Sequence, residues 1–328
     1  MKFRTLARRA ALSAICAACA MPLATAHAQA AWPSRPITLV VPQAAGGTND
    51  IAGRLVAQKL GELLGGSAVV DNRPGAGGNI GTQLVARAPK DGYTLLMTIS
   101  SSQAINPALY RNPGFDPVKD FVPIGLVGSV PNVLLVNPAF PARDLPSFLA
   151  AARAPDTHYQ YASAGNGTLN HLLGEMLNSM AGLKLQHVPY KGVAPAMNDV
   201  VGGQLPILFG SLPSALPHIK AGKLRAIAVS GARRSPALPE VPAIAEAMPG
   251  YAGTLWIGLF APAGTPPEVT ARLQQAMARA MAAPDLRAKL EQQGVEIAEA
   301  TPAQFAQLLR DDLVKWAAIV KSSGAAID

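Results

Sequence analysis

Short apolar runs alternate along the chain with longer segments whose apolar residues recur at helical spacing. Strands that alternate with amphipathic helices are typical of βαβ units, so the pattern predicts parallel sheets covered by helices. In the first third of the chain it predicts strands at 37–42, 67–72 and 93–99 and helices at 49–64 and 79–87.

A second set of the same kind follows the run "PNVLLVNP" and predicts a second α/β lobe. Its predicted helices are 145–152, 168–180, 194–201 and 212–221, and its predicted strands are 159–163, 185–190, 205–210 and 224–230. A strand at 253–262 and helices at 266–282 and 301–320 complete the chain. The last helix carries Phe305, Leu308, Leu309, Trp316, Ile319 and Val320 on one side. We expect these last elements to return to the first lobe.

Two extended stretches, 126–136 and 251–261, have Gly or Pro near their ends and lie between the two sets. If both cross from one lobe to the other, they form a hinge. A single continuous sheet without moving parts is the alternative, and periodicity alone does not rank the two.

The N-terminus has the features of a secretory signal. Four basic residues in "MKFRTLARRA" precede the apolar stretch "ALSAICAACAMPLA", and Ala26 and Ala28 supply an A-x-A cleavage pattern. We therefore expect export and cleavage after Ala28. Cys16 and Cys19 would be removed, so the mature chain would have no thiol for a disulfide, a metal or a substrate. No later apolar segment reaches the roughly 20 residues that a membrane-spanning helix needs.

Charge and length narrow the class of protein. Cleavage removes four of the 28 basic residues and leaves 24 against 20 acidic ones. This balance is too small and scattered to indicate a nucleic-acid partner. A mature chain of about 300 residues usually exceeds one core, which agrees with two lobes.

The stretch "VPQAAGGTND", residues 41–50, joins a predicted strand to a predicted helix. Gly46 and Gly47 allow a tight turn, and Thr48 and Asp50 are residue types that begin helices. Free amides at a helix start attract anions of any kind. The alternative is simply a capped strand-to-helix turn.

Nucleotide sites fit poorly. The loop lacks the lysine of a P-loop, and in "NRPGAGGNIG" the last glycine of a dinucleotide motif would fall on Ile80. A glycine-rich turn that lets a helix pack close to the sheet is the favoured interpretation of that second cluster. In the other predicted lobe, "SAGNGTLNHLLGEML" repeats the arrangement of the first loop, with Thr168 at a helix start and His171 as a packing residue or a ligand.

Catalysis is poorly supported. His158, His171, His187 and His218 show no metal-ligand spacing, and no G-x-S-x-G motif is present. Ser163, Ser211 or Ser214 would need a histidine brought close by the fold. We expect no metal and no cofactor.

The blocks "WPSRPITLVVPQAAGGTND", "DNRPGAGGNIGTQLVARAPKDGYTLL", "SAGNGTLNHLLGEML", "VPYKGVAPAMNDVVGGQ", "LPHIKAGKLRAIAVSG" and "APAGTP" follow one another in this order. Together they resemble the Bug family, the extracytoplasmic solute receptors of tripartite tricarboxylate transporters (TctC-like). The resemblance covers essentially the whole mature chain. It is specific to the family and not to the ligand.

The resemblance implies an α/β, type II periplasmic-binding-protein fold, in which two crossover strands join two α/β lobes with a ligand cleft between them. It divides the chain into a signal peptide (1–28), lobe 1 (29–131), lobe 2 (132–254) and a return segment of lobe 1 (255–328). It implies a monomeric periplasmic receptor, not an enzyme, that captures a small carboxylate by hinge closure and delivers it to a transporter. A sensor of the same fold and a secreted α/β enzyme are the alternatives.

Carried onto matching positions, the resemblance nominates ligand-binding residues in both lobes. They are Ala45, Gly46, Gly47, Thr48 and Asp50 in the first and Gly167, Thr168 and His171 in the second, with Ser100, Ser101, Tyr190 and Lys191 as weaker candidates. For Asp50, a helix cap is favoured over contact with a ligand ammonium.

One departure bears on the ligand: the family commonly has acidic residues where this chain has Pro206 and Gly210. If Gly210 faces the cleft, a plain carboxylate or aromatic acid is favoured over an amino acid.

Overall fold

The computed structural model describes residues 32–155, 157–190 and 192–324. Its first elements are β1 (Ile37–Val41), α2 (Thr48–Leu64), β2 (Ala68–Asn72), η1 (Ala76–Gly78), α3 (Asn79–Ala86), β3 (Thr94–Ile99), η2 (Ser101–Ile105), α4 (Asn106–Leu109) and β4 (Phe121–Val136). The predicted cleavage after Ala28 lies outside the described residues.

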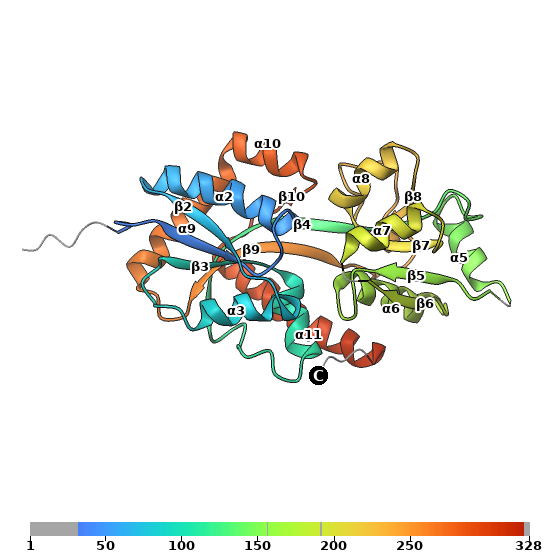
Figure 1. Ribbon diagram of the computed structural model, residues 1–328, viewed down its shortest axis with the longest axis horizontal. Coiled ribbons are helices and arrows are strands. Elements are labelled where there is room, and N and C mark those ends of the chain that lie inside the picture. The colour runs from blue at the N-terminus through green and yellow to red at the C-terminus, as the bar shows by residue number, and fades with distance from the viewer. Residues whose placement is uncertain (1–31, 156, 191, 325–328) are drawn as a thin grey trace, which may run out of the picture. The chain divides into compact units, whose positions relative to one another are not determined.

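The chain continues with the second group of elements and then returns (Figure 1). These are α5 (Leu145–Arg153), β5 (Gln160–Ser163), α6 (Leu169–Ala181), β6 (Gln186–Pro189), α7 (Val193–Val201), β7 (Ile207–Ser211), α8 (Leu212–Lys220), β8 (Arg225–Val229), η3 (Ile244–Glu246), β9 (Thr254–Pro262), α9 (Pro267–Ala282), α10 (Pro284–Gln292), β10 (Glu296–Ile297) and α11 (Pro302–Ser323).

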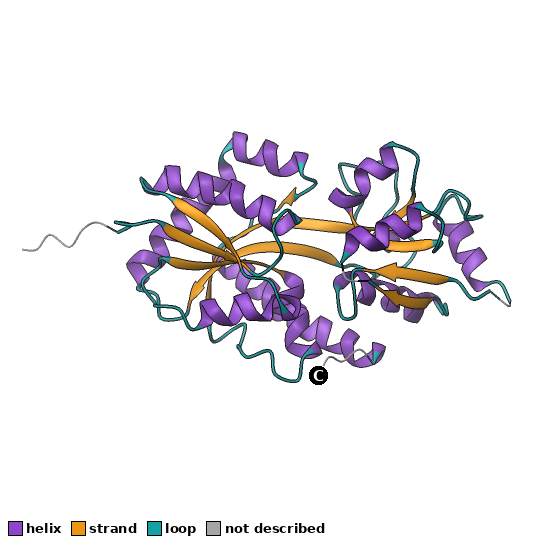
Figure 2. Cartoon of the chain, in the orientation of Figure 1, coloured by secondary structure: helices purple, strands orange, loops and turns teal. Residues whose placement is uncertain are grey.

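The predicted parallel pairing is present in both groups. β1 pairs in parallel with β2 and β3, and β9 joins β3 to β4 in antiparallel sense. In the second group β5 pairs in parallel with β6 and β7, while β7 and β8 pair with β4. Helices lie on both faces of these strands (Figure 2). The apolar runs form strands because both faces are covered, and Leu39, Val40 and Val41 of β1 are almost completely buried.

β4 is the strand that joins the two sheets. Its residues up to Pro131 pair with β9, and its residues from Asn132 onward pair with β7. β4 and β9 therefore lie side by side, as the two predicted crossing stretches require (Figure 1). The lobe limits at 131/132 and 254/255 stay a prediction, which the change of partner on β4 supports.

The closing helix α11 begins at a capping box formed by Thr301 and Gln304. It packs on η2, α4 and β4, as expected for a return to the first lobe, and it also contacts α6. Four of the six side chains predicted on its inner side are buried and the other two are half-buried.

Among the described residues, five helical segments were not among the predicted elements: η1, α4, η3, α10, and the π-helical turn η2 in "TISSSQAINP". Within the described ranges, no helix has the length and apolarity to cross a membrane.

Candidate functional site

The carboxyl ends of parallel strands lie at one edge of a sheet, where ligands of open α/β sheets bind. In lobe 1 the loops that leave β1, β2 and β3 share such an edge, and in lobe 2 those that leave β5, β6 and β7 do. The turn after β5 reaches α4, because a Cβ added at Gly167 would overlap the Leu109 side chain. The two loop-bearing edges therefore face each other.

The loop after β1 exposes a helix start. Ala45, Gly46 and Gly47 are exposed, and Gly46 has a left-handed backbone (φ 81°) that favours glycine. Gly47 is the N-cap of α2, and no side chain caps this helix. Its first amides, starting at Thr48, have no acceptor within the helix. They are available to an anion.

Asp50 holds this loop in shape. Its carboxylate accepts the Gly46 N–H at 2.8 Å and pairs with Arg54 at 3.0 Å, and the residue is 3% exposed. Burial opposes ionisation, but the bonds from Arg54 and Gly46 outweigh it and hold the pKa of Asp50 below its ordinary value. Asp50 therefore does not cap α2, the role favoured from the sequence, because its carboxylate accepts the N–H of Gly46, the residue before the N-cap.

At the end of β3, Ser100 and Ser101 enter the π-helical turn η2. Ser100 is completely buried, and its Oγ has no hydrogen-bond partner among the described residues. Ser101 is half-buried. Single π-helical turns are frequent at functional sites. Ser100 therefore has a free polar group at the loop-bearing edge.

Three polar residues that were not predicted join the loops of lobe 1. Gln43 Nε2 donates to Ser102 Oγ at 3.0 Å, Ser102 Oγ donates to the Gly77 carbonyl at 2.9 Å, and Asn106 Nδ2 donates to the same carbonyl at 3.0 Å. Gln43 and Ser102 lie just beyond the ends of β1 and β3, whereas Asn106 is the first residue of α4. A polar residue directly after a predicted strand is the signal in the sequence that could have identified Gln43 and Ser102.

The second glycine cluster serves packing. Gly78 has φ 101°, and a Cβ there would collide with Ser102 Oγ. A Cβ at Gly81 would come within 2.7 Å of the Arg73 carbonyl oxygen. The favoured interpretation, a turn that lets α3 approach the sheet, agrees with this geometry.

In lobe 2, Thr168 is the N-cap of α6. Its Oγ1 donates to the Gly165 carbonyl at 2.7 Å and accepts the His171 N–H at 3.4 Å. Gly167 has φ 70°. The turn thus has the expected form, with the start of α6 at the loop-bearing edge.

The side chain of His171 makes its polar contacts within lobe 2. Its Nδ1 accepts the Gly167 N–H at 3.0 Å, its Nε2 lies 3.9 Å from Glu175 Oε1, and the residue is 8% exposed. Burial lowers the pKa of His171, so the ring is neutral at pH 7. This geometry favours a role in shaping the turn over direct contact with a ligand.

Tyr190 is half-buried, and its backbone N–H donates to the Ser163 carbonyl beside the turn. Its hydroxyl donates to Asp199 at 2.6 Å, and this bond raises the pKa of Tyr190 to about 12. The hydroxyl is therefore engaged within lobe 2. Lys191 lies outside the described residues.

Gly210 does not face the cleft, so the condition on which it would bear on the ligand is not met. A Cβ there would point at Leu135, Met197 and Leu208, which are core residues of lobe 2. Pro206 precedes the first residue of β7, at the end opposite to Ser211. Neither position informs the choice between carboxylates and amino acids.

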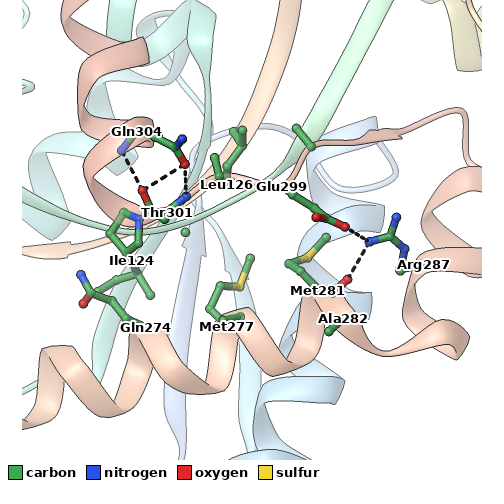
Figure 3. A pocket seen from close by; sticks show the side chains of 15 residues that line it. Ile124, Leu126, Gln274, Met277, Met281, Ala282, Arg287, Glu299, Thr301 and Gln304 are labelled. Carbon is green, nitrogen blue, oxygen red and sulfur yellow. Dashed lines mark hydrogen bonds and ion pairs between the residues drawn. The ribbon is translucent and has the colours of Figure 1, made fainter.

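A pocket of 480 Å³ lies away from all these loops, between β4, α9 and the start of α11 (Figure 3). Ile124, Leu126, Met277 and Met281 give it an apolar lining, and Arg287 pairs with Glu299 at 3.2 Å on one side. None of the predicted site residues contributes to it. Within the described ranges, no three His, Asp or Glu side chains gather as a metal ligand set.

Comparison with known proteins identifies the family. Residues 52–325 match the family model "Tripartite tricarboxylate transporter family receptor". The chain belongs to this family. Protein BugT of Bordetella pertussis is 35% identical over 296 residues, which are 90% of this chain and 91% of BugT. The predicted resemblance to Bug receptors is therefore confirmed.

Solved structures agree with this assignment. "R. palustris Rpa4515 with adipate" is 36% identical, with a TM-score of 0.82 over 90% of this chain and 99% of that one. "MatC (Rpa3494) from Rhodopseudomonas palustris with bound malate" is 32% identical, with a TM-score of 0.77 over 88% and 100%. The receptor has the expected two-lobe fold of periplasmic binding proteins.

Proposed function

We propose that this receptor binds a small dicarboxylate between its lobes and releases it to a membrane transporter. The observation that carries the proposal is the pair of glycine turns at the starts of α2 and α6, on edges that face each other. Two relatives that share most of the chain's length were solved with adipate and malate, which supports this class of ligand.

In this proposal one carboxylate meets the free amides that begin at Thr48, beside the exposed backbone of Ala45, Gly46 and Gly47, and the turn at Gly167 and Thr168. Ser100 and Ser101 lie at the same edge as the first loop. Tyr190 and Lys191 follow β6 at the second edge. Asp50 and His171 keep the two turns in shape.

Magnitudes explain why two turns are needed. A micromolar ligand requires about 8 kcal/mol, whereas a hydrogen bond to a charged group contributes about 1.5–3 kcal/mol. One exposed turn supplies few such bonds, and two turns that close on the same anion supply enough.

The predicted signal peptide would deliver the receptor to the periplasm, where we propose that it acts as a monomer with the transporter as its partner. A sensor protein as the partner is the alternative. Pull-down from membranes with and without ligand distinguishes the two by the protein that is captured. We propose no catalytic activity and no cofactor.

A thermal-shift screen tests the function. Adipate and malate at 100 times their Kd should stabilise the fold by about 2.7 kcal/mol, seen as a rise in Tm of roughly 5 °C. Monocarboxylates, amino acids and aromatic acids define the limits of the ligand class. The proposal is wrong if no acid raises Tm or if a carboxylate is consumed during the assay.

A further inference from the structure

Two stacked imidazoles lie against the turn Gly165–Thr168. His171 comes from α6 and His187 from β6, and their ring centroids are 3.9 Å apart with 18° between the planes. Each ring is linked to one end of the turn.

His171 holds one end directly. Because Nδ1 accepts the Gly167 N–H, this atom must carry a lone pair, and the single ring proton must sit on Nε2. Nε2 lies toward Glu175 Oε1. A second proton on Nδ1 would place two N–H donors against each other and break the bond to Gly167.

His187 holds the other end through a serine. Its Nε2 lies 2.6 Å from Ser163 Oγ, and this oxygen accepts the Gly165 N–H at 3.0 Å. The Ser163 hydroxyl can serve as donor or acceptor toward the ring, so either tautomer of His187 keeps this link. His171 has no such freedom.

We propose that His171 is a positioning residue for the second-lobe turn, and that its protonation switches the receptor to a state of low carboxylate affinity. The inference rests on the proposed function, since it concerns the same site. It assigns a pH response to a receptor whose ligand is itself an acid.

The groups around His171 set this response. Among the described residues, Glu175 on the same helix is the charged group close to the ring, and it favours protonation of His171. His187 from β6 and Tyr161 from β5 also face this cluster, and the Tyr161 hydroxyl donates to Glu175 at 2.7 Å. On α11, which packs on α6, Asp312 accepts a bond from Trp256 and Lys315 donates to the Ala252 carbonyl, so both are engaged elsewhere.

Burial keeps both rings neutral near pH 7. It lowers the pKa of His171 despite Glu175, and it lowers the pKa of His187 to about 4, with a smaller contribution from His171. The proton that breaks the turn's hydrogen bond is the one taken up by His171, the ring whose neutral form the turn requires.

Two substitutions of His171 separate its role as a hydrogen-bond acceptor from its uptake of a proton. In His171→Asn an amide oxygen can occupy the place of Nδ1 and cannot be protonated, whereas His171→Gln offers its amide at the place of Nε2. Calorimetric titration with adipate from pH 5 to pH 8 gives Kd for each protein.

At pH 8 we expect His171→Asn to bind within about threefold of wild type and His171→Gln to bind about tenfold more weakly, the loss of one bond to a structured turn. As the pH falls, the Kd of wild type should rise more steeply than that of His171→Asn, whose profile reports the titration of adipate alone. Equal profiles for the two proteins, or full affinity in His171→Gln, would overturn the inference.

A second measurement covers the case in which the variants do not fold. The ¹⁵N shifts of the His171 ring in wild type should show an unprotonated Nδ1 at pH 8, and Glu175→Gln should move the acid limb of the Kd profile to lower pH. A protonated Nδ1 at pH 8, or an unmoved limb, contradicts the proposal. Binding of neither adipate nor malate nor any other acid by wild type at any pH would instead contradict the proposed function.

Discussion

At the scale of single residues, hydrogen bonds decide which predicted site residues face a ligand and which shape the loops. The residue types of the first loop predicted a helix start with free amides, and the uncapped start of α2 agrees. The role of Asp50 depends on its bond from the Gly46 N–H, and the role of His171 depends on its bond from the Gly167 N–H. Such bonds depend on backbone geometry that a single sequence does not contain.

Replacing Asp50 tests its role in the first loop. Asp50→Asn should lower the free energy of unfolding at pH 7 by about 1.5–3 kcal/mol, because the bonds to the charged carboxylate are lost. The folded-state pKa of Asp50 is depressed, so its contribution is present above 3.8, the ordinary value, and is lost as the pH falls through the folded pKa. Urea unfolding of wild type and Asp50→Asn at pH 7 and pH 3 measures the loss of stability and its dependence on pH. If the free energies of unfolding of wild type and Asp50→Asn differ as much at pH 3 as at pH 7, this role is contradicted.

At the scale of elements, the sequence pattern predicted nearly every strand and helix of the two sheets. Segments such as 37–42 and 49–64 were predicted correctly for two reasons. Burial of a strand on both faces selects apolar residues, and glycine turns separate the strands from the helices. η2 was missed because its three successive serines look like a loop and its packing against α11 is a long-range contact. The two crossing stretches were predicted, but periodicity could not exclude a single sheet.

The N-caps of α6 and α11 provide a matched comparison. Thr168→Ala and Thr301→Ala each remove a cap and should cost about 1 kcal/mol of stability. Only Thr168 lies at the loop-bearing edge, so only its replacement should also weaken adipate binding, by about tenfold. Denaturant unfolding gives the loss of stability of each variant, and calorimetric titration gives its affinity for adipate. Equal affinities for the two variants would remove Thr168 from the site.

At the scale of the whole molecule, the change of partners along β4 makes a hinge physically reasonable. When two lobes close around a ligand, a few residues between them absorb the change in backbone angles. The fold class followed from the resemblance, which spans the mature chain. The contact between the second-lobe turn and α4 could not be predicted, because it joins residues far apart in the sequence.

Closure predicts a change in size on binding. Adding saturating adipate should reduce the radius of gyration measured by small-angle X-ray scattering, because the lobes approach each other around the ligand. The variant Gly47→Val at the same adipate concentration serves as the control. A radius of gyration that stays constant while adipate binds would favour a rigid receptor.

The most direct test of the carboxylate site is calorimetric titration of adipate into wild type, Gly47→Val and Gly202→Val. Both glycines have negative φ, −76° and −75°, so a side chain strains neither backbone. The nearest atoms to an added Cβ are backbone oxygens 3.4 Å and 3.3 Å away, so the two variants are matched in crowding, and a thermal melt of each checks that it folds. Gly202 precedes β7, at the end of that strand opposite to the loop-bearing edge. We predict that Gly47→Val abolishes measurable binding while Gly202→Val binds like wild type. Unchanged affinity in Gly47→Val would contradict the proposed site.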